Sequence, residues 1–353
     1  MTRQQTLQLK GIAILFMLWL HLFSSGEGFV SSLSWINGAP LAVVLKKLCS
    51  MCVPMYAFLG GVGLAATYEA ASGHNASMHN GRRVAMLYAN FWTVLLIFYG
   101  VGYMNNPTLF NFHIPEFLYT LAALDYKVNG TWWFLLPYAM ITAMAAPFLR
   151  QVYSLDRKME SWMFVALLVM HIAGYVGVDI ASKDNWLVYI LLRTACNFFL
   201  ILFPFATGAL FHKHRTIHNC RLALEKRFTP RRKNMLVGGL LACLVFIKLC
   251  IGASALFNPW FVFLLIPLYC MCGYPSKVER LLCFFGRHST NIWLCHNFFI
   301  FGVWGSLIYD LHFPLLIFAA LLLVSTVTSY IIKMVYVPVK RLVEPVLNRA
   351  LQM

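Results

Sequence analysis

Long apolar runs recur along the whole chain, separated by short polar segments. A membrane-spanning helix needs about 20 mostly apolar residues. Ten segments approach that length, at residues 10–26, 49–69, 84–103, 131–149, 161–178, 187–209, 235–253, 257–273, 289–307 and 313–335. The pattern predicts an all-α polytopic membrane protein with about ten transmembrane helices, forming one integral-membrane domain over residues 1–353.

Composition supports this fold class over a soluble one. Hydrophobic residues make up 60% of the 353 residues and charged residues 11%, whereas a soluble domain averages roughly 25% charged residues. Length alone would suggest two or three soluble domains. The apolar composition overrides that estimate.

The net charge of +16 is explained by membrane topology. With the N-terminus in the cytoplasm, 21 of the 28 Lys and Arg residues lie in inner segments and four in outer ones. This asymmetry follows the positive-inside rule and predicts that both termini are cytoplasmic. We therefore expect the lipid bilayer, and no nucleic acid, as a partner.

Cysteines and termini suggest no further chemistry. Most of the ten Cys lie in apolar runs, where they act as small packing residues, and none has partners at zinc spacing. We expect no metal site. The first apolar run lacks a convincing cleavage site, so we expect it to be a retained span. The outer segment "HIPEFLYTLAALDY" predicts a short interfacial helix.

Ionisable side chains within spans are costly and therefore informative. Lys10 and His21 are eleven residues apart, close to three helical turns, so a lysine at the cytosolic mouth and an imidazole roughly 16 Å deeper share one helix face. A neutral imidazole can act as a general base near pH 7. The alternative is a topological anchor and a core histidine.

Two later spans also carry ionisable groups. His296, nine residues after Arg287, is expected at a depth near that of His21. Arg193 must face a cavity, an acidic partner or the headgroups, and Asp179 or Asp184 could pair with it.

Arginines and tryptophans at span ends permit two interpretations each. Arg82 and Arg83 open the third expected span, as topological charges or as a phosphate clamp, since guanidinium forks match phosphate oxygens. Trp133, in "TWWFLLPY", belongs either to an aromatic belt or to a platform that stacks on a sugar.

Several of these stretches, in order, resemble the bacterial membrane acyltransferase family called acyltransferase 3. Its first span carries an Arg, ten residues and a His, similar to "KGIAILFMLWLH". Its later segments resemble "VPMYAFLGGVGL", "RRVAMLYANFW", "TWWFLLPYAMITAMAAPFL", "FPFATGAL" and "FFGRHSTNIWLCH". The likeness covers most of the chain. It departs where Lys10 replaces the family's Arg, where Met86 replaces a second basic residue three positions after Arg83, and at Gly60, where the family usually has a Ser.

The resemblance implies a membrane O-acyltransferase in the bacterial inner membrane. Acyl-CoA, with acetyl as the expected group, would be the donor substrate rather than a permanently bound cofactor, held by Lys10, Arg82 and Arg83. The acceptor would be a hydroxyl on a cell-surface glycan or lipid-linked sugar. His21 would be the general base or an acyl relay. His296 would share the catalytic work, and Arg193 and Trp133 would position substrate.

Three other functions stay open at this point. A transporter of a polar solute would also need ionisable residues in its spans, but it favours deep acidic residues and internal repeats, which the sequence lacks. A membrane acyltransferase of another class, acting on lipids or proteins, is disfavoured by the first-span Lys10–His21 spacing. An inactive relative remains possible because of Met86.

Overall fold

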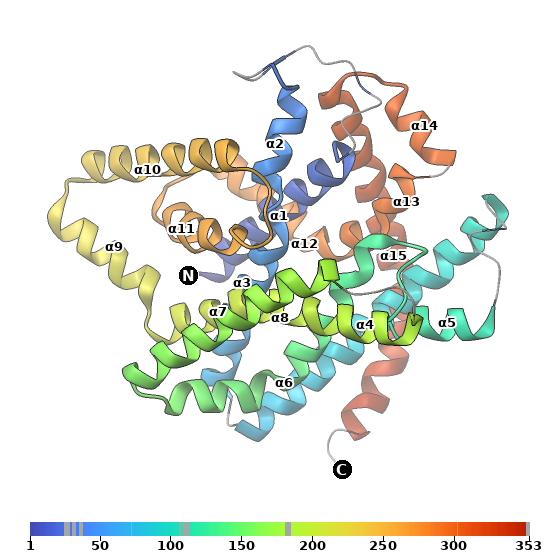
Figure 1. Ribbon diagram of the computed structural model, residues 1–353, viewed down its shortest axis with the longest axis horizontal. Coiled ribbons are helices and arrows are strands. Elements are labelled where there is room, and N and C mark those ends of the chain that lie inside the picture. Colours follow the sequence, from blue (N-terminus) through green and yellow to red (C-terminus); the bar gives the residue numbers. More distant parts are fainter. Residues whose placement is uncertain are drawn as a thin grey trace. The chain divides into compact units, whose positions relative to one another are not determined.

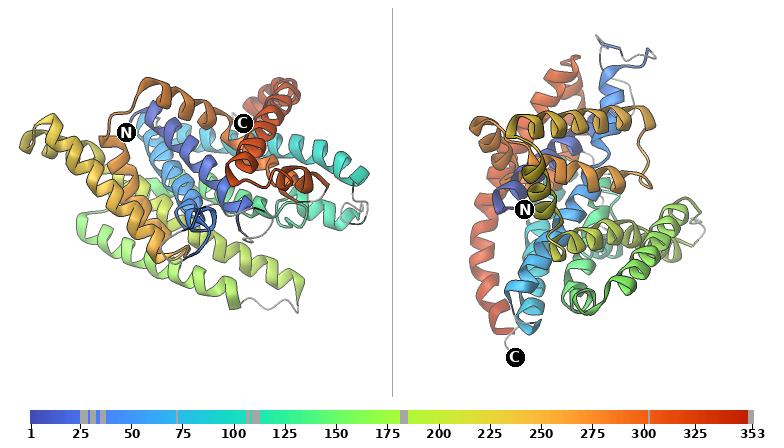
Figure 2. Two further views of the ribbon diagram at one scale, coloured as in Figure 1. Left: turned by 90° about the horizontal axis from the view of Figure 1, so that it is seen from above. Right: turned by 90° about the vertical axis from the view of Figure 1, so that its left-hand side faces the viewer.

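The computed structural model of the protein is built from helices (Figures 1 and 2). It describes residues 1–24, 29, 33–34, 38–71, 73–105, 108, 113–180, 185–301 and 303–350. Within these residues the chain forms fifteen α-helices and one 3-10 helix, without a strand. The elements are α1 (Arg3–Leu22), α2 (Leu41–Cys49), α3 (Cys52–Ala70), α4 (Gly73–Asn105), α5 (Ile114–Leu121), η1 (Gly130–Phe134), α6 (Leu135–Ser154), α7 (Arg157–Ile180), α8 (Trp186–Lys213), α9 (Thr216–Arg227), α10 (Pro230–Ile251), α11 (Asn258–Met271), α12 (Ser276–Cys295), α13 (Asn297–Ile300), α14 (Val303–Tyr309) and α15 (Pro314–Ala350).

Eight helical segments of the described residues are long and apolar enough to cross a membrane. They are Arg3–Leu22, Leu41–Ala70, Asn75–Met104, Gly130–Ser154, Arg157–Val178, Trp186–Lys213, Pro230–Ile251 and Pro314–Arg349. The protein is therefore an all-α polytopic membrane protein, as predicted. The number of ten spans is not confirmed, and the single domain and the cytoplasmic termini stay predictions.

Two expected spans differ from the prediction. Residues 257–273 contain α11, an apolar helix of only 14 residues. Residues 289–307 are not one continuous span, because α12 ends at Cys295 and the short helices α13 and α14 follow. Charged residues in the first half of α12 lower its hydropathy, and side chains from other segments bind the carbonyl groups where it ends.

The structure also locates the starts of two helices, α4 and α5, in polar segments of the chain. α4 begins at Gly73, so Arg82 and Arg83 lie more than two turns inside the helix instead of opening it. The expected helix in the segment that follows α4 is confirmed as α5, Ile114–Leu121. Pro115 in its first turn fits the helix start, because the missing N–H there needs no partner.

The chain divides into two compact units, and the first comprises residues 1–66, 203–289 and 312–318. In this unit α10 packs on α11 (Figure 1), and α1 crosses α12 at two glycines. A Cβ on Gly11 would lie 2.1 Å from the Leu282 carbonyl oxygen, and one on Gly286 would lie 2.0 Å from that of Leu7. Neither position admits a side chain, so the two helix backbones touch directly.

The second unit comprises residues 67–202, 290–311 and 319–353. α4 packs on α6, and hydrogen bonds from side-chain amides hold the end of α12. The Asn90 amide donates to the Asn291 side-chain oxygen (2.8 Å), and the Asn291 amide donates to the Ser329 carbonyl (3.2 Å). These bonds join α4, α12 and α15.

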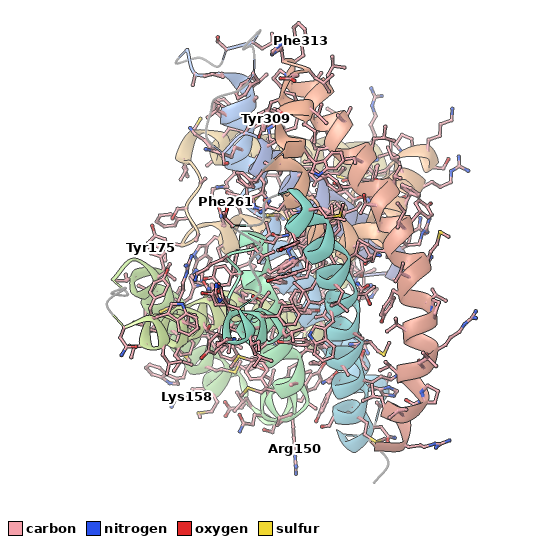
Figure 3. The ribbon with its side chains drawn as sticks, turned by 90° about the vertical axis from the view of Figure 1, so that its right-hand side faces the viewer. Arg150, Lys158, Tyr175, Phe261, Tyr309 and Phe313 are labelled. Carbon is pink, nitrogen blue, oxygen red and sulfur yellow. The ribbon has the colours of Figure 1, made fainter. Side chains whose placement is uncertain are left out.

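Two basic side chains of the second unit lie far from Tyr309 of the same unit. Figure 3 shows Arg150, in α6, and Lys158, in α7, toward one end of this unit, and Tyr309, in α14, toward the other.

Candidate functional site

Lys10 and His21 lie on one unbroken helix in the first unit. α1 begins with a capping box, in which the Thr2 hydroxyl and the Gln5 side chain each accept a hydrogen bond from the other residue's backbone N–H. The helix runs without interruption to Leu22, so Lys10 and His21 face the same side, about 16 Å apart along the axis. Both residues are half-buried. The geometry is the one that the sequence predicted for this pair.

The end of α1 that carries His21 is fixed by polar contacts. The Ser24 hydroxyl donates to the His21 carbonyl (3.1 Å), and the Lys46 ammonium donates to the Ser24 carbonyl (2.9 Å). A cation at this position compensates the negative end of the helix dipole. The Trp19 indole also donates to the Ala42 carbonyl (2.9 Å), so α2 holds the last turn of α1 in place.

Arg82 and Arg83 line one cavity of about 420 Å³ in the second unit. Arg82 pairs with the Glu344 carboxylate, and the Arg83 guanidinium donates to the Thr67 hydroxyl (3.1 Å). The cavity is lined by Thr67, His79, Arg82, Arg83, Met86, Tyr336, Lys340 and Glu344. With three cations and one carboxylate it is positively charged, which suits a phosphate-bearing ligand.

Met86, the residue that departs from the family pattern, also lines this cavity. The Tyr336 hydroxyl donates to the Met86 carbonyl (3.0 Å), and Lys340 lies one turn further along the same helix, α15. The structure therefore places an ammonium group in the cavity where Met86 supplies no charge.

Arg193, in α8, is held by aromatic rings. Its guanidinium carbon lies 5.0 Å from the centroid of the Tyr126 ring and 5.5 Å from that of the Tyr189 ring, and it donates to the Tyr189 hydroxyl. Burial raises the pKa of Tyr126 to about 12, although the nearby Arg193 charge opposes the shift. Of the acidic partners expected from the sequence, Asp184 and the Asp179 side chain lie outside the described residues.

His296 directly follows α12 and is fully buried. Its ring Nδ1 lies 3.1 Å from the Ile292 carbonyl oxygen and 2.9 Å from that of Trp293. Carbonyl oxygens only accept, so Nδ1 carries the proton and donates. In the neutral ring Nε2 then keeps its lone pair. These two hydrogen bonds fix the orientation of the imidazole ring at the end of α12.

The segment around η1 docks on the same helix end. The Asn129 amide and the Trp132 indole both donate to the Leu294 carbonyl (3.2 and 3.0 Å). The Trp293 indole donates in return to the Thr131 carbonyl (3.1 Å). Carbonyl groups that the break in α12 would leave unpaired are thus satisfied by side chains.

Trp132 and its neighbour Trp133 have different environments. Trp132 is fully buried, with its ring 4.8 Å from the Phe91 ring, and it serves as the structural anchor. Trp133 is half-buried and contacts the Phe134 ring edge-on. Of the two indoles, Trp133 keeps the more accessible surface, as its predicted contact with substrate requires.

The structure groups the predicted residues only in part. Lys10 and His21 belong to the first unit, and Arg82, Arg83, Trp133, Arg193 and His296 to the second. Sequence reasoning missed the cavity residues His79, Lys340 and Glu344. Lys340 and Arg341 follow the last expected span, where a basic residue is accounted for by topology, and no local signal distinguishes a ligand-facing lysine there.

Comparison with protein families gives a match over most of the chain. A family model described as an acyltransferase domain matches residues 8–334, which include all seven predicted site residues but not Lys340 or Glu344. Searches among curated proteins and among solved structures found no match. The family match does not favour the transporter interpretation. A first span with Lys10 and His21 in register and a match this extensive lead to one conclusion: this multi-pass membrane protein is an acyltransferase and belongs to the acyltransferase 3 family.

Proposed function

We propose that the protein transfers an acyl group, with acetyl as the expected group, from cytoplasmic acyl-CoA to a hydroxyl of a cell-surface glycan or lipid-linked sugar. The membrane would be the inner membrane of a bacterial cell. The observation that carries the proposal is the continuous helix α1, which sets Lys10 and His21 on one face within the family-matched region.

The donor would be held through its phosphates. Guanidinium groups bind phosphate oxygens through paired N–H donors, and the cavity of Arg82 and Arg83 presents both, with Lys340 as a further cation. Lys10, in the first half of α1, would contribute a further point charge to donor binding. Acyl-CoA is a substrate in this scheme, so no permanently bound cofactor is needed.

The chemical step is the exchange of a thioester for an ester. The His21 imidazole accepts the proton of the acceptor hydroxyl as its oxygen attacks the thioester carbonyl. The tetrahedral intermediate collapses, the carbon–sulfur bond breaks, and the CoA thiolate takes the proton back from the imidazolium. The products are an acyl ester on the sugar and free CoA thiol.

Three further residues would position the acceptor. His296, whose ring orientation is fixed by the hydrogen bonds from Nδ1 to two backbone carbonyls, would orient the acceptor hydroxyl. Arg193, fixed by two tyrosine rings, would be a preorganised cation for the developing negative charge. Trp133 would stack on a sugar face.

The test is the mass of surface glycans from cells that carry the intact protein, His21→Ala, or His218→Ala, compared at equal membrane levels. His218 is an exposed histidine on α9 and serves as the matched control. We expect the mass of one small acyl group with the intact protein and with His218→Ala, and its loss with His21→Ala. An increment that persists in His21→Ala would rule out His21 as the base, and its absence with the intact protein would rule out a surface-glycan acceptor.

A further inference from the structure

A second cavity, of about 550 Å³, lies in the first unit and has no part in the proposed reaction. It opens between α1 and α12. The lining residues are Arg3, Gln4, Leu7, Arg280, Cys283 and Arg287. Three of the six are arginines, and Leu7 and Cys283 contribute apolar surface.

Three exposed arginines from two helices line this cavity. Arg280 and Arg287 are seven residues apart on α12, so they lie on one face, about 10 Å apart along the axis. Arg3 comes from the first turn of α1. Among the residues that the structure describes, none of the three has a carboxylate partner. The nearby Glu279 carboxylate accepts instead from the Gln4 amide (3.3 Å).

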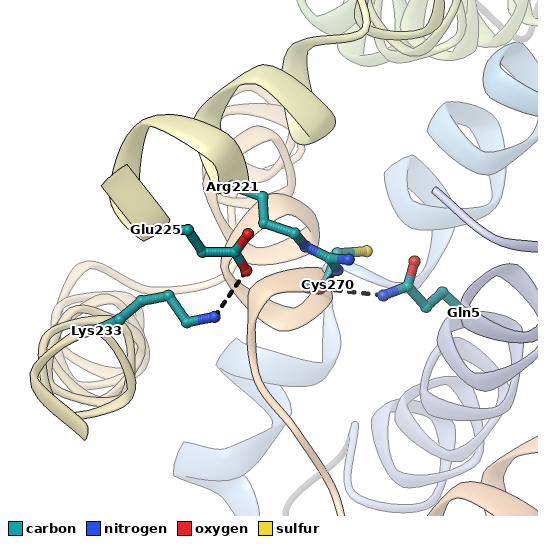
Figure 4. A network of polar contacts seen from close by, with 5 residues as sticks. All are labelled: Gln5, Arg221, Glu225, Lys233 and Cys270. Atoms are coloured by element: carbon teal, nitrogen blue, oxygen red, sulfur yellow. Dashed lines mark hydrogen bonds and ion pairs between the residues drawn. The ribbon is translucent and has the colours of Figure 1, made fainter. Parts of the chain in front are cut away.

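Other basic side chains of the same unit have a hydrogen-bond or ion-pair acceptor. Figure 4 shows that the Cys270 carbonyl accepts from both the Gln5 amide (3.0 Å) and the Arg221 guanidinium. In the same view Lys233 pairs with the Glu225 carboxylate (3.0 Å). Arg221 and Lys233 thus each have an acceptor, whereas none of the three cavity arginines has a carboxylate partner among the described residues.

The walls of the cavity are held at a fixed spacing. α1 and α12 touch backbone to backbone at Gly11 and Gly286, and the Cys283 thiol donates to the Gln4 carbonyl (3.8 Å). The positive-inside rule asks only for basic residues near the cytoplasmic ends of spans. It does not require three of them to line one cavity, where like charges repel.

We infer that Arg3, Arg280 and Arg287 form a binding site for a phosphate group. The phosphate belongs either to the headgroup of an anionic phospholipid, whose chain the apolar wall suits, or to a soluble phosphate compound. The site is independent of acyl transfer, so its failure leaves the proposed reaction untouched.

The test uses the full-length protein in neutral detergent with two probes. Phosphatidylglycerol retention is measured by native mass spectrometry, and inorganic pyrophosphate affinity by calorimetry. The variant replaces all three arginines with Gln. A control replaces Arg231, Arg232 and Lys277, which are exposed in the same unit, with Gln and so has the same net charge. Arg280→Gln alone, on an exposed residue, is a milder second variant.

We expect at least one probe to bind, with its affinity lowered about ten-fold or more in the triple variant, at least about three-fold in Arg280→Gln, and less than about two-fold in the control. Phosphatidylglycerol that pyrophosphate cannot displace identifies a lipid headgroup, and pyrophosphate binding that displaces the lipid identifies a soluble phosphate. The inference is overturned if neither probe binds the intact protein, or if the control variant loses as much affinity as the triple variant.

Discussion

Lys340→Met is the substitution that most directly examines how the positive cavity of the second unit binds a phosphate donor. Lys340 shares this cavity with Arg82, Arg83 and Met86. If Lys340 supplies the charge that Met86 lacks, its removal should weaken binding of coenzyme A, and Met86→Arg in the same variant should restore it.

The size of the effect follows from the cavity dimensions. A cavity of about 420 Å³ places a phosphate roughly 4–5 Å from the charges in its wall, where one unit pair is worth about 1 kcal/mol in water and about 4 kcal/mol at an effective dielectric constant of 20. Lys340 is exposed, so the lower value applies. A loss of about 1 kcal/mol raises the dissociation constant about five-fold.

The assay is calorimetric titration of coenzyme A into the full-length protein, which needs no knowledge of the acceptor. Arg341→Met is the matched control, because Arg341 is the adjacent exposed cation and does not line the cavity. The reasoning is refuted if Lys340→Met binds coenzyme A as tightly as the intact protein does, or if Arg341→Met weakens binding equally.

Three further predictions concern packing and ionisation. Gly286→Ala should lower the melting temperature, because overpacking costs about 1–3 kcal/mol of folding free energy. Gly63→Ala, whose Cβ would meet open space, should not lower it. Equal melting temperatures for the two variants would contradict the direct backbone contact between α1 and α12. In denaturant titrations, Trp132→Phe should lower the free energy of unfolding by about 1 kcal/mol, because it removes one hydrogen bond. Trp132→Ala should lower it by about 3–5 kcal/mol, because it also removes the buried ring. Equal losses would mean that the indole N–H, and not the ring, anchors this segment. Burial raises the pKa of Tyr126 to about 12 from about 10 in the unfolded chain, so its contribution to stability should be complete below pH 10 and lost as the pH rises toward 12. In the absorbance of tyrosinate, Tyr126→Phe should remove the contribution of a group that titrates near pH 12, and Arg193→Gln should move that contribution to higher pH. An unchanged titration curve in Tyr126→Phe would refute the assignment.

The helices were predictable where local pattern determines them. α1 is long and apolar, and the Lys10–His21 relation depends only on helical periodicity within that one element, so both followed from the sequence. The break after Cys295 did not. It depends on the Asn129 and Trp132 side chains, whose partner carbonyl is more than 160 residues away along the chain, and no window of hydropathy contains both partners.

The candidate site shows the same limit. Arg82 and Arg83 were identified because two adjacent arginines at a span end are conspicuous, but the lysine and carboxylate that complete their cavity come from the far end of α15. The distinction between Trp132 and Trp133 likewise depends on which indole meets the Leu294 carbonyl. The sequence therefore indicates which residue types could form a site, whereas contacts between segments far apart in the chain determine which residues come together.

The docking of η1 on the broken end of α12 bears on the order in which the chain is assembled in the membrane. A helix end in hydrocarbon needs partners for its carbonyl groups, so the segment around Leu294 is poorly suited to insert alone. Its donors at Asn129 lie 165 residues earlier, and at about 5–20 residues per second they leave the ribosome roughly 8–33 s before their acceptor does. The segment that carries the hydrogen-bond donors is therefore synthesised first. The segment around Leu294 can then pair its carbonyl groups with those donors as it inserts.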